Sequence, residues 1–207
     1  MNSRPVLGLD IDGTIAAYHE HYLAFVEAWL GKPVPRKYDG SVPLHTWCGI
    51  SKATYRESKR AYRMGGAKRS MPTLAPPLPD AARLTHTVAK WGVDVYLCTT
   101  RPYLAHDNID PDTRHWVRRN GVRCRGVIWG EHKYRDLVRM VGKGRVFAVV
   151  DDLPTMCDQA ASLNVPTVFA LRDHNLNDAP TYMHLSARTE DETLAVLRAL
   201  LQDWRGK

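Results

Sequence analysis

The chain has 207 residues, of which 44% are hydrophobic and 25% are charged, a balance typical of a folded protein rather than a disordered one. No apolar stretch approaches the roughly 20 residues of a membrane-spanning helix, and the run ending at Asp10 is too short and too acidic for a signal peptide. We therefore expect a cytoplasmic protein without a membrane partner. The formal charge of +7 favours an anionic partner of unspecified kind.

Short apolar runs with little polar alternation predict five buried strands, at residues 5–10, 93–98, 122–128, 145–150 and 166–171. Helical patterns lie between them. One begins at Asp110-Pro111 and ends at Asn120-Gly121, and an amphipathic helix closes the chain. Strands that alternate with helices predict an α/β fold, here a Rossmann-like three-layer α/β/α sandwich with a mostly parallel sheet. In such a sheet the ligand binds at the carboxyl ends of the strands, so we expect the chemistry there.

The alternation is interrupted after the first strand. A helix carrying Tyr22 and Val26 is followed by a proline- and glycine-rich stretch at 31–49, a basic helix at about 51–64 and a second irregular stretch at 65–79. We predict that residues 16–76 form a small helical cap. The core would then consist of residues 1–15 and 77–207.

Two carboxylates follow the first strand directly, in Asp10-Ile11-Asp12-Gly13-Thr14. Carboxylates one residue apart at a strand end can converge on one cation, while Gly13 supplies the tight turn. The same D-x-D-G pattern also occurs in calcium loops and in ordinary turns. A calcium EF-hand needs further oxygen ligands, however, and this loop continues into apolar residues.

Later features of the chain raise the odds of a functional site. The strand at 93–98 leads into Thr99-Thr100, whose hydroxyls can hold a phosphate oxygen, and the strand at 145–150 leads into Asp151-Asp152. Adjacent buried carboxylates repel one another unless a cation or a proton compensates. Lys133 lies between these strands in the sequence, near the start of a helix. Each element alone is common, but the ordered set is specific.

This ordered set resembles the four motifs of the haloacid dehalogenase superfamily of phosphatases, and the resemblance covers nearly the whole chain. It implies that Asp10 is a nucleophile that forms an aspartyl-phosphate, while Asp12 protonates the leaving oxygen and then activates water. It also implies that Thr99, together with Thr100, holds the transferring phosphate and that Lys133 neutralises it.

The resemblance further implies a Mg²⁺ cofactor. Its ligands would be Asp10, Asp12 through its main-chain carbonyl, Asp152 and the adjacent Asp151. The expected partner is a small-molecule phosphate ester, and the number of copies in an assembly, a homodimer included, is left open.

Within that superfamily the chain is most similar to the 5'(3')-deoxyribonucleotidases, by its cap, its Cys98-Thr99-Thr100-Arg101-Pro102 segment and Val150-Asp151-Asp152. The resemblance implies a nucleoside monophosphate substrate whose base stacks on Tyr18. The alternative is that Tyr18 simply packs in the cap. The chain departs from that family in its extra Arg101 and in a longer interval from Lys133 to Asp151.

A second hypothesis is a polynucleotide 3'-phosphatase. Arg101 follows the threonines as an arginine does in the phosphatase domains of polynucleotide kinase-phosphatases, and a basic stripe on one helix face can track a phosphate backbone. That stripe comprises Lys52, Arg56, Lys59, Arg60 and Arg63, followed by Lys68-Arg69. It can equally be a solvated face.

A non-catalytic phosphate-binding module is a third hypothesis. The residues expected to contact substrate are Gly13, Tyr18, Lys68, Arg69, Thr100 and Arg101.

Overall fold

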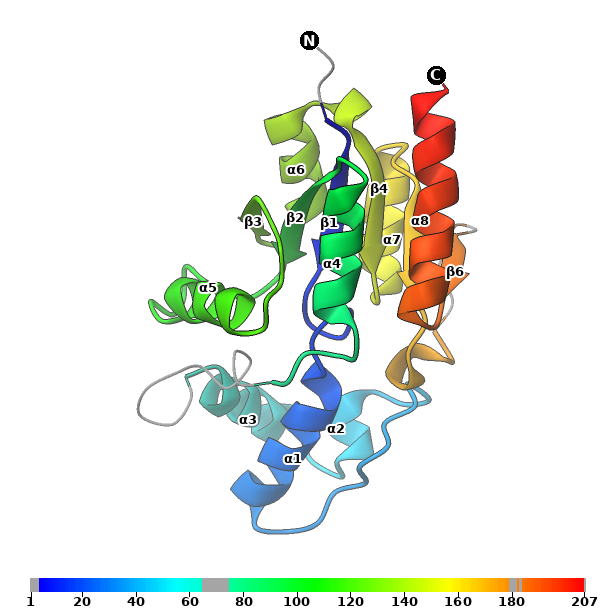
Figure 1. Ribbon diagram of the computed structural model, residues 1–207. Helices are drawn as coiled ribbons and strands as arrows, with labels where there is room; N and C mark the ends of the chain where they lie inside the picture. The colour runs from blue at the N-terminus through cyan, green and yellow to red at the C-terminus, as the bar shows by residue number, and fades with distance from the viewer. Residues whose placement is uncertain (1–3, 65–74, 179–181, 183, 207) are drawn as a thin grey trace.

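A parallel sheet organises the chain (Figure 1). The computed structural model describes residues 4–64, 75–178, 182 and 184–206. Within these residues the sheet has six strands in the order β3-β2-β1-β4-β5-β6, and every neighbouring pair is parallel. The strands are β1 Val6–Asp10, β2 Asp94–Thr99, β3 Gly126–Trp129, β4 Val146–Asp151, β5 Thr167–Ala170 and β6 Leu185–Ala187.

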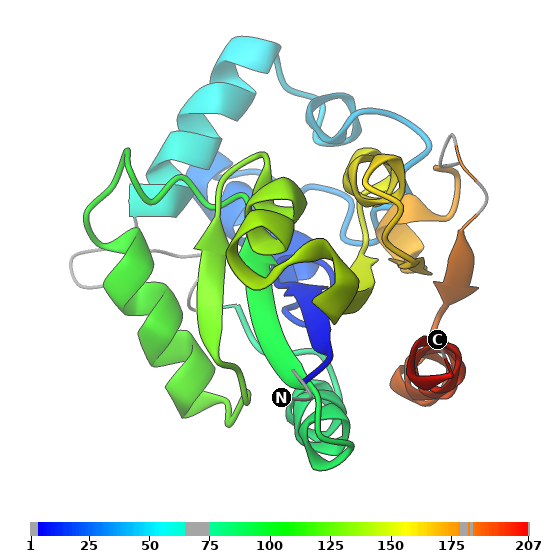
Figure 2. The same cartoon turned by 90° about the horizontal axis from the view of Figure 1, so that it is seen from above.

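Helices cover both faces of the sheet, as Figures 1 and 2 show. On one face α4 and α8 pack with Leu84, Val88, Leu197 and Leu201, and on the other α6 and α7 pack with Tyr134, Leu137 and Ala160. Every residue of β1, β4 and β5 is buried, which explains their uninterrupted apolar sequences. The expected Rossmann-like α/β/α sandwich is confirmed. The helices are α4 Ala81–Lys90, α5 Ile109–Arg119, α6 Lys133–Val141, α7 Pro154–Ser162 and α8 Glu190–Arg205, with 3₁₀ turns η2 Lys143–Arg145 and η3 Asp173–Asn175.

Two local expectations were wrong, and one strand was not expected. The strand expected at 122–128 begins only at Gly126, because Val122 still closes the preceding helix and its N–H bonds to the Val117 carbonyl at 3.0 Å. That helix, α5, begins at Ile109 rather than at Pro111, which is tolerated because first-turn nitrogens need no partner within the helix. Strand β6 was not expected, since its three residues are mostly exposed and carry no apolar run.

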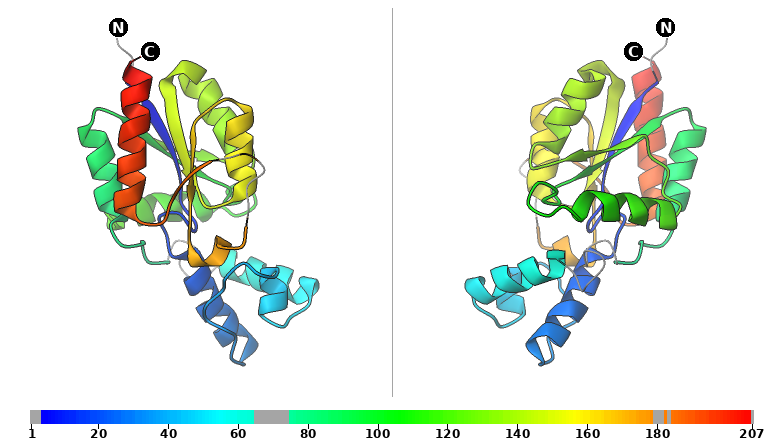
Figure 3. Two further views of the ribbon diagram at one scale, coloured as in Figure 1. Left: turned by 90° about the vertical axis from the view of Figure 1, so that its right-hand side faces the viewer. Right: turned by 90° about the vertical axis from the view of Figure 1, so that its left-hand side faces the viewer.

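Helices α1 Tyr18–Leu30, α2 Leu44–Trp47 and α3 Lys52–Met64 lie beyond the carboxyl ends of the strands, as the side views of Figure 3 show. They share a hydrophobic cluster of their own, centred on Tyr22, Leu23, Val26 and Tyr62. Inside it the Tyr22 hydroxyl hydrogen-bonds with the Ser58 hydroxyl at 2.7 Å, which ties α1 to α3. The basic helix predicted at about 51–64 is therefore α3, and one of its faces is buried.

None of the described helices is both long and apolar enough to cross a membrane.

Candidate active site

The sheet register places the acidic residues at one level. Asp10 is the last residue of β1 and Asp151 the last residue of β4. Leu9 pairs with Val150 across these neighbouring strands, so the residues that follow them, Asp10 and Asp151, lie side by side. Asp10 also pairs with Cys98 of β2, which brings Thr99 and Thr100 to the same edge. Parallel pairing thus gathers residues that are far apart in the sequence.

Three carboxylates converge at this edge. Oxygens of Asp10, Asp151 and Asp152 all lie within 4.8 Å of one another, and all three residues are buried. The ammonium of Lys133, at the start of α6, contacts Oδ1 of Asp10 and lies 2.6 Å from Oδ2 of Asp151. The Tyr134 hydroxyl also donates to Oδ2 of Asp151, at 2.5 Å.

Burial dominates the electrostatics of this group. It raises the pKa of Asp10 and of Asp151, although Lys133 opposes the rise in both. Burial alone would lower the pKa of Lys133, but its two carboxylate partners raise it, so the lysine stays charged. One ammonium cannot offset three carboxylates. Buried carboxylate oxygens with excess negative charge form the donor set that a hard divalent cation such as Mg²⁺ takes, so the residues present fit the metal.

Asp152 is held on three sides. The Thr14 hydroxyl donates to its Oδ1 at 3.0 Å, and Nε2 of His174 lies 2.7 Å from its Oδ2. The Asn175 side chain donates to its main-chain oxygen at 2.8 Å. Burial raises the pKa of Asp152, but the hydrogen bond with His174 and the electrostatic influence of His174, His19 and Lys133 together outweigh it, so the net shift is downward.

Gly13 is required by this arrangement. Its φ of +91° lies in the left-handed region, and a Cβ at this position would stand 2.1 Å from Oδ2 of Asp152. Gly13 was expected to contact phosphate; in the structure it makes room for the Asp152 carboxylate.

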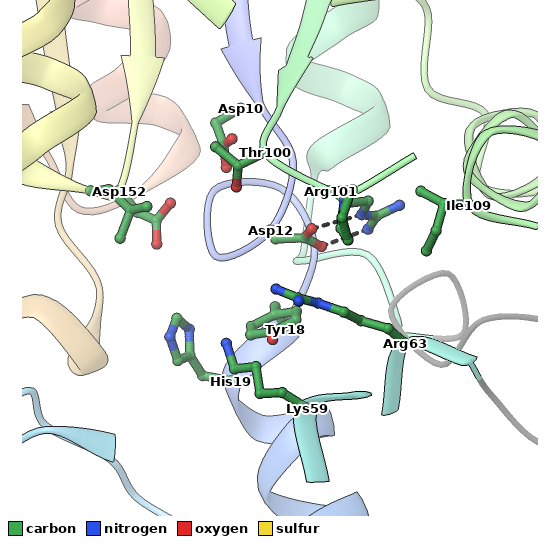
Figure 4. Close-up of a pocket in the computed structure, with 12 residues that line it drawn as sticks. Asp10, Asp12, Tyr18, His19, Lys59, Arg63, Thr100, Arg101, Ile109 and Asp152 are labelled. Atoms are coloured by element: carbon green, nitrogen blue, oxygen red, sulfur yellow. Dashed lines mark hydrogen bonds and ion pairs between the residues drawn. The ribbon is translucent and has the colours of Figure 1, made fainter. Parts of the chain in front are cut away.

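The Asp12 carboxylate lies outside this group and faces Arg101 (Figure 4). Arg101 donates from Nε to Oδ2 at 2.7 Å and from Nη2 to Oδ1 at 2.5 Å, and its Nη1 donates to the Thr113 hydroxyl at 2.9 Å. Arg101 is only 4% exposed. A part-buried two-point ion pair therefore fixes the Asp12 side chain, which stands apart from the three converging carboxylates.

A cavity of about 160 Å³ opens in front of these residues. Half of the predicted site residues line it, namely Asp10, Asp12, Tyr18, Thr100, Arg101 and Asp152, together with Lys59 and Arg63 of α3 (Figure 4). Thr99 does not line it: its side chain is buried, and its hydroxyl accepts a hydrogen bond from the Arg101 N–H at 3.2 Å. Thr100, not Thr99, thus presents its hydroxyl to the cavity. Lys68 and Arg69 lie outside the described residues.

Tyr18 combines both of its expected environments. It lines the cavity, and it also packs edge-on against Tyr62 with ring centroids 5.6 Å apart. The ring is therefore anchored in the α1–α3 cluster while part of it stays accessible.

Several residues of the site were not predicted from the sequence. His174, which holds Asp152, belongs to no motif by which it could be found. Thr14, which also holds Asp152, is the last residue of the Asp10–Thr14 motif but was given no role of its own. Lys59 and Arg63 were seen only as part of a basic stripe, although their spacing of four places them on the same helix face.

His19 is a further neighbour of the three carboxylates. Its ring stacks on that of His174 with centroids 3.8 Å apart, and it lies close enough to share a cation with His174 and Asp152. Its Nδ1 is buried and has no hydrogen-bond partner among the described residues. Burial, and then the adjacent His174, lower the pKa of His19 to about 3.

Among comparisons of the chain with known proteins, the one with solved structures agrees with this architecture. No family model matches the sequence, and no curated protein matches it. A haloacid dehalogenase-like hydrolase from Streptococcus pneumoniae superposes with a TM-score of 0.63 at 17% identity, covering 95% of this chain and 100% of that one. A haloacid dehalogenase-superfamily hydrolase from Geobacter sulfurreducens gives a TM-score of 0.58 at 17% identity, covering 94% and 96%.

This chain has the haloacid dehalogenase-like fold. A third structure with that fold is a D,D-heptose 1,7-bisphosphate phosphatase from B. bronchiseptica, complexed with magnesium and phosphate. It superposes with a TM-score of 0.56 at 14% identity, covering 96% of this chain and 99% of that one.

Proposed function

We propose that this chain is a magnesium-dependent phosphomonoesterase that works through an aspartyl-phosphate on Asp10. The observation that carries the proposal is the convergence of Asp10, Asp151 and Asp152 on one buried point, with Lys133 beside them and an open cavity in front. The names of structural neighbours that include phosphatases add support. Buried like charges at a cavity floor are costly for a merely structural role.

The atom of Asp10 that attacks phosphorus is Oδ2. Lys133 holds Oδ1, and Oδ2 accepts no hydrogen bond from the described residues. Oδ2 forms the new bond to phosphorus while the bond to the leaving oxygen breaks, and Asp12 gives that oxygen its proton. A water then attacks phosphorus and passes its proton to Asp12, which releases phosphate and restores Asp10. Thr100 donates to a phosphoryl oxygen, and Lys133 stays protonated throughout.

A bound Mg²⁺ would be held by Asp10, Asp151, Asp152 and the main-chain carbonyl of Asp12. It would offset the negative charge shared by the nucleophile and the phosphoryl oxygens, which otherwise repel one another.

The substrate we propose is a nucleoside monophosphate, with residues 16–76 as the cap that contacts the nucleoside. The position of Tyr18 supports this, since an anchored aromatic ring on the cavity wall can stack on a base. The second candidate, a polynucleotide 3'-phosphatase, is supported by Arg101 on the cavity wall and by the cations of α3 near it.

Two assays test the proposal. Magnesium-dependent release of phosphate from para-nitrophenyl phosphate is expected, and its absence from the folded protein would leave only a phosphate-binding module. A panel of mononucleotides is then compared with a 3'-phosphorylated oligonucleotide at two salt concentrations. We expect the mononucleotides to give the higher kcat/KM; a dominant oligonucleotide activity that falls steeply with salt would replace the first candidate by the second.

A further inference from the structure

A basic groove continues from the active-site cavity along α3. It is lined by Tyr55, Arg56, Lys59, Arg60, Arg63 and His106 and encloses about 580 Å³. Lys59 and Arg63 line both the groove and the cavity, so the two spaces meet at these side chains. Figure 4 shows Arg63 extending from α3 toward Asp12 and Arg101, and Lys59 extending toward Tyr18 and His19. His106, from the segment after β2, lines the same groove from outside α3.

The buried face of α3 fixes which residues face the groove. Ser58 and Tyr62 are fully buried against α1, and the His21 ring nitrogen hydrogen-bonds with the Tyr62 hydroxyl at 2.8 Å. Arg56, Arg60 and Arg63 follow one another at spacings of four and three, which places them along one side of the helix. From Arg56 to Arg63 the row advances by seven residue steps, about 10 Å along the helix axis. The row of cations is therefore held in place by packing on the opposite side.

No acidic side chain of the described residues forms an ion pair with Arg56, Lys59, Arg60 or Arg63. Like charges three and four residues apart on a helix repel one another. Lys59 is moreover held over three rings, with its Nζ 5.2, 5.4 and 5.3 Å from the ring centroids of Tyr18, Tyr22 and Tyr55. A row of cations that form no ion pair with any described residue, one of them preorganised by tyrosine rings, is complementary to an anion at the proposed phosphatase site.

The volume of the cavity indicates that part of the substrate lies in the groove. Pockets for whole small molecules usually enclose roughly 300–1,000 Å³. The cavity, at about 160 Å³, is below this range. A substrate larger than a phosphoryl group and the part that meets Tyr18 must therefore extend into the groove.

We propose that the α3 groove is a subsite for a second phosphate group, carried by the leaving group of the substrate. The inference rests on the proposed phosphatase activity but not on the choice between a mononucleotide and a polynucleotide end. A second phosphomonoester, as in a nucleoside 3',5'-bisphosphate, and a phosphodiester, as in a 3'-phosphorylated dinucleotide, present the same chemistry to Arg56 and Arg60. If the row were only a solvated helix face, substrates with one and two phosphates would be treated alike.

The test compares kcat/KM for three substrates: a nucleoside 5'-monophosphate, the matching 3',5'-bisphosphate and a 3'-phosphorylated dinucleotide. The test protein is the double variant Arg56→Gln/Arg60→Gln, whose two arginines line the groove and not the cavity. The matched control is Arg118→Gln/Arg119→Gln, which removes the same charge from two exposed residues of α5.

We expect the unaltered enzyme to prefer at least one substrate with a second phosphate by about tenfold or more. That preference should disappear in the α3 variant, persist in the α5 control and weaken with added salt. Which substrate is preferred tells the phosphomonoester from the phosphodiester. Turnover of all three substrates without preference, or equal losses in both double variants, would overturn the subsite and leave the phosphatase proposal standing. Failure to hydrolyse any phosphomonoester, para-nitrophenyl phosphate included, would instead remove the phosphatase proposal itself.

Discussion

The guanidinium group of Arg101 holds both carboxylate oxygens of Asp12, at 2.5 and 2.7 Å, in a site where the arginine is almost completely buried. If Asp12 is the proton donor to the leaving group, this ion pair has two effects. It orients the carboxylate toward the cavity, and it has to loosen when Asp12 carries its proton. Arg101 is therefore a positioning residue for Asp12 rather than only a phosphate ligand.

Arg101→Lys should lower kcat about 10- to 100-fold for nucleotide substrates, because lysine keeps the charge but loses the two-point geometry. The loss should be much smaller for para-nitrophenyl phosphate, whose leaving group needs little protonation. The measurement is kcat against leaving-group pKa for both proteins. Arg114→Lys, at an exposed arginine that pairs with Asp110, is the matched control and should change neither rate. Equal losses across all leaving groups would mean that Arg101 does not act through Asp12.

Gly13→Ala should weaken magnesium binding, since the new Cβ would collide with Oδ2 of Asp152. We expect the Mg²⁺ concentration for half-maximal activity to rise at least about tenfold. The control variant Gly31→Ala distinguishes the effect of this collision from the effect of backbone strain alone. Gly31 also has a positive φ, of +64°, but its Cβ would meet nothing within 4 Å. The control should lose about 1 kcal/mol of stability and keep its magnesium dependence. An unchanged magnesium dependence in Gly13→Ala would contradict the role given to Asp152.

Mg²⁺ should stabilise the folded protein, because a cation relieves the repulsion among Asp10, Asp151 and Asp152 and the unfolded chain has no such site. At about 100 times its Kd the metal would add about 2.7 kcal/mol, a rise in Tm of roughly 5–10 °C for a chain of this size. Chelation should reverse the rise. Asp152→Asn should abolish it, whereas Asp191→Asn, at an exposed residue of α8, should not. A Tm that does not respond to Mg²⁺ would argue against the metal site.

Acid should destabilise the protein through His19. Its pKa is lowered to about 3 by burial and by His174, while an unfolded histidine has a pKa of about 6.5. The unfolded chain therefore binds the extra proton first, and stability present above about pH 6.5 is lost as the pH falls toward 3. The charged and titratable groups facing His19 are His174, Asp152 and Lys59. At pH 5 the loss amounts to as much as about 2 kcal/mol.

Urea unfolding at pH 8 and pH 5 measures this loss. His19→Phe keeps a ring against His174 but cannot be protonated, so its free energy of unfolding should fall less between the two pH values. Identical pH dependence in both proteins would show that His19 is not the group responsible. His86, an exposed histidine of α4, supplies the control variant His86→Phe, which should behave like the unaltered protein.

The fold was predictable where the physics is local or periodic. Buried strands such as β1 and β4 have continuous apolar sequences, which predict them directly. The acidic residues at their carboxyl ends are predicted to meet, because neighbouring parallel strands end at the same edge of the sheet. Strand β6 was not predictable, since a three-residue edge strand with two exposed residues depends on its neighbour rather than on its own sequence.

The same contrast holds within the site. The Asp10, Lys133 and Asp151 constellation follows from strand ends and motif order, whereas the support of Asp152 by His174 joins residues 22 positions apart through the tertiary structure alone. The sequence does not show whether Thr99 or Thr100 faces the cavity. Adjacent residues at a strand end point to opposite sides, so only one of the two hydroxyls can do so. Only the structure shows which hydroxyl reaches the cavity.

The most direct test of the account is to identify the phosphorylated residue. The enzyme is mixed with Mg²⁺ and a phosphate ester, quenched with acid during turnover and treated with borohydride, which reduces an acyl phosphate to an alcohol. Peptide mass spectrometry should then find homoserine in place of Asp10, and Asp10→Asn protein should show neither the product nor turnover. Steady release of phosphate with Asp10 intact, or with the reduced residue elsewhere in the chain, would contradict the assignment of Asp10 as the nucleophile.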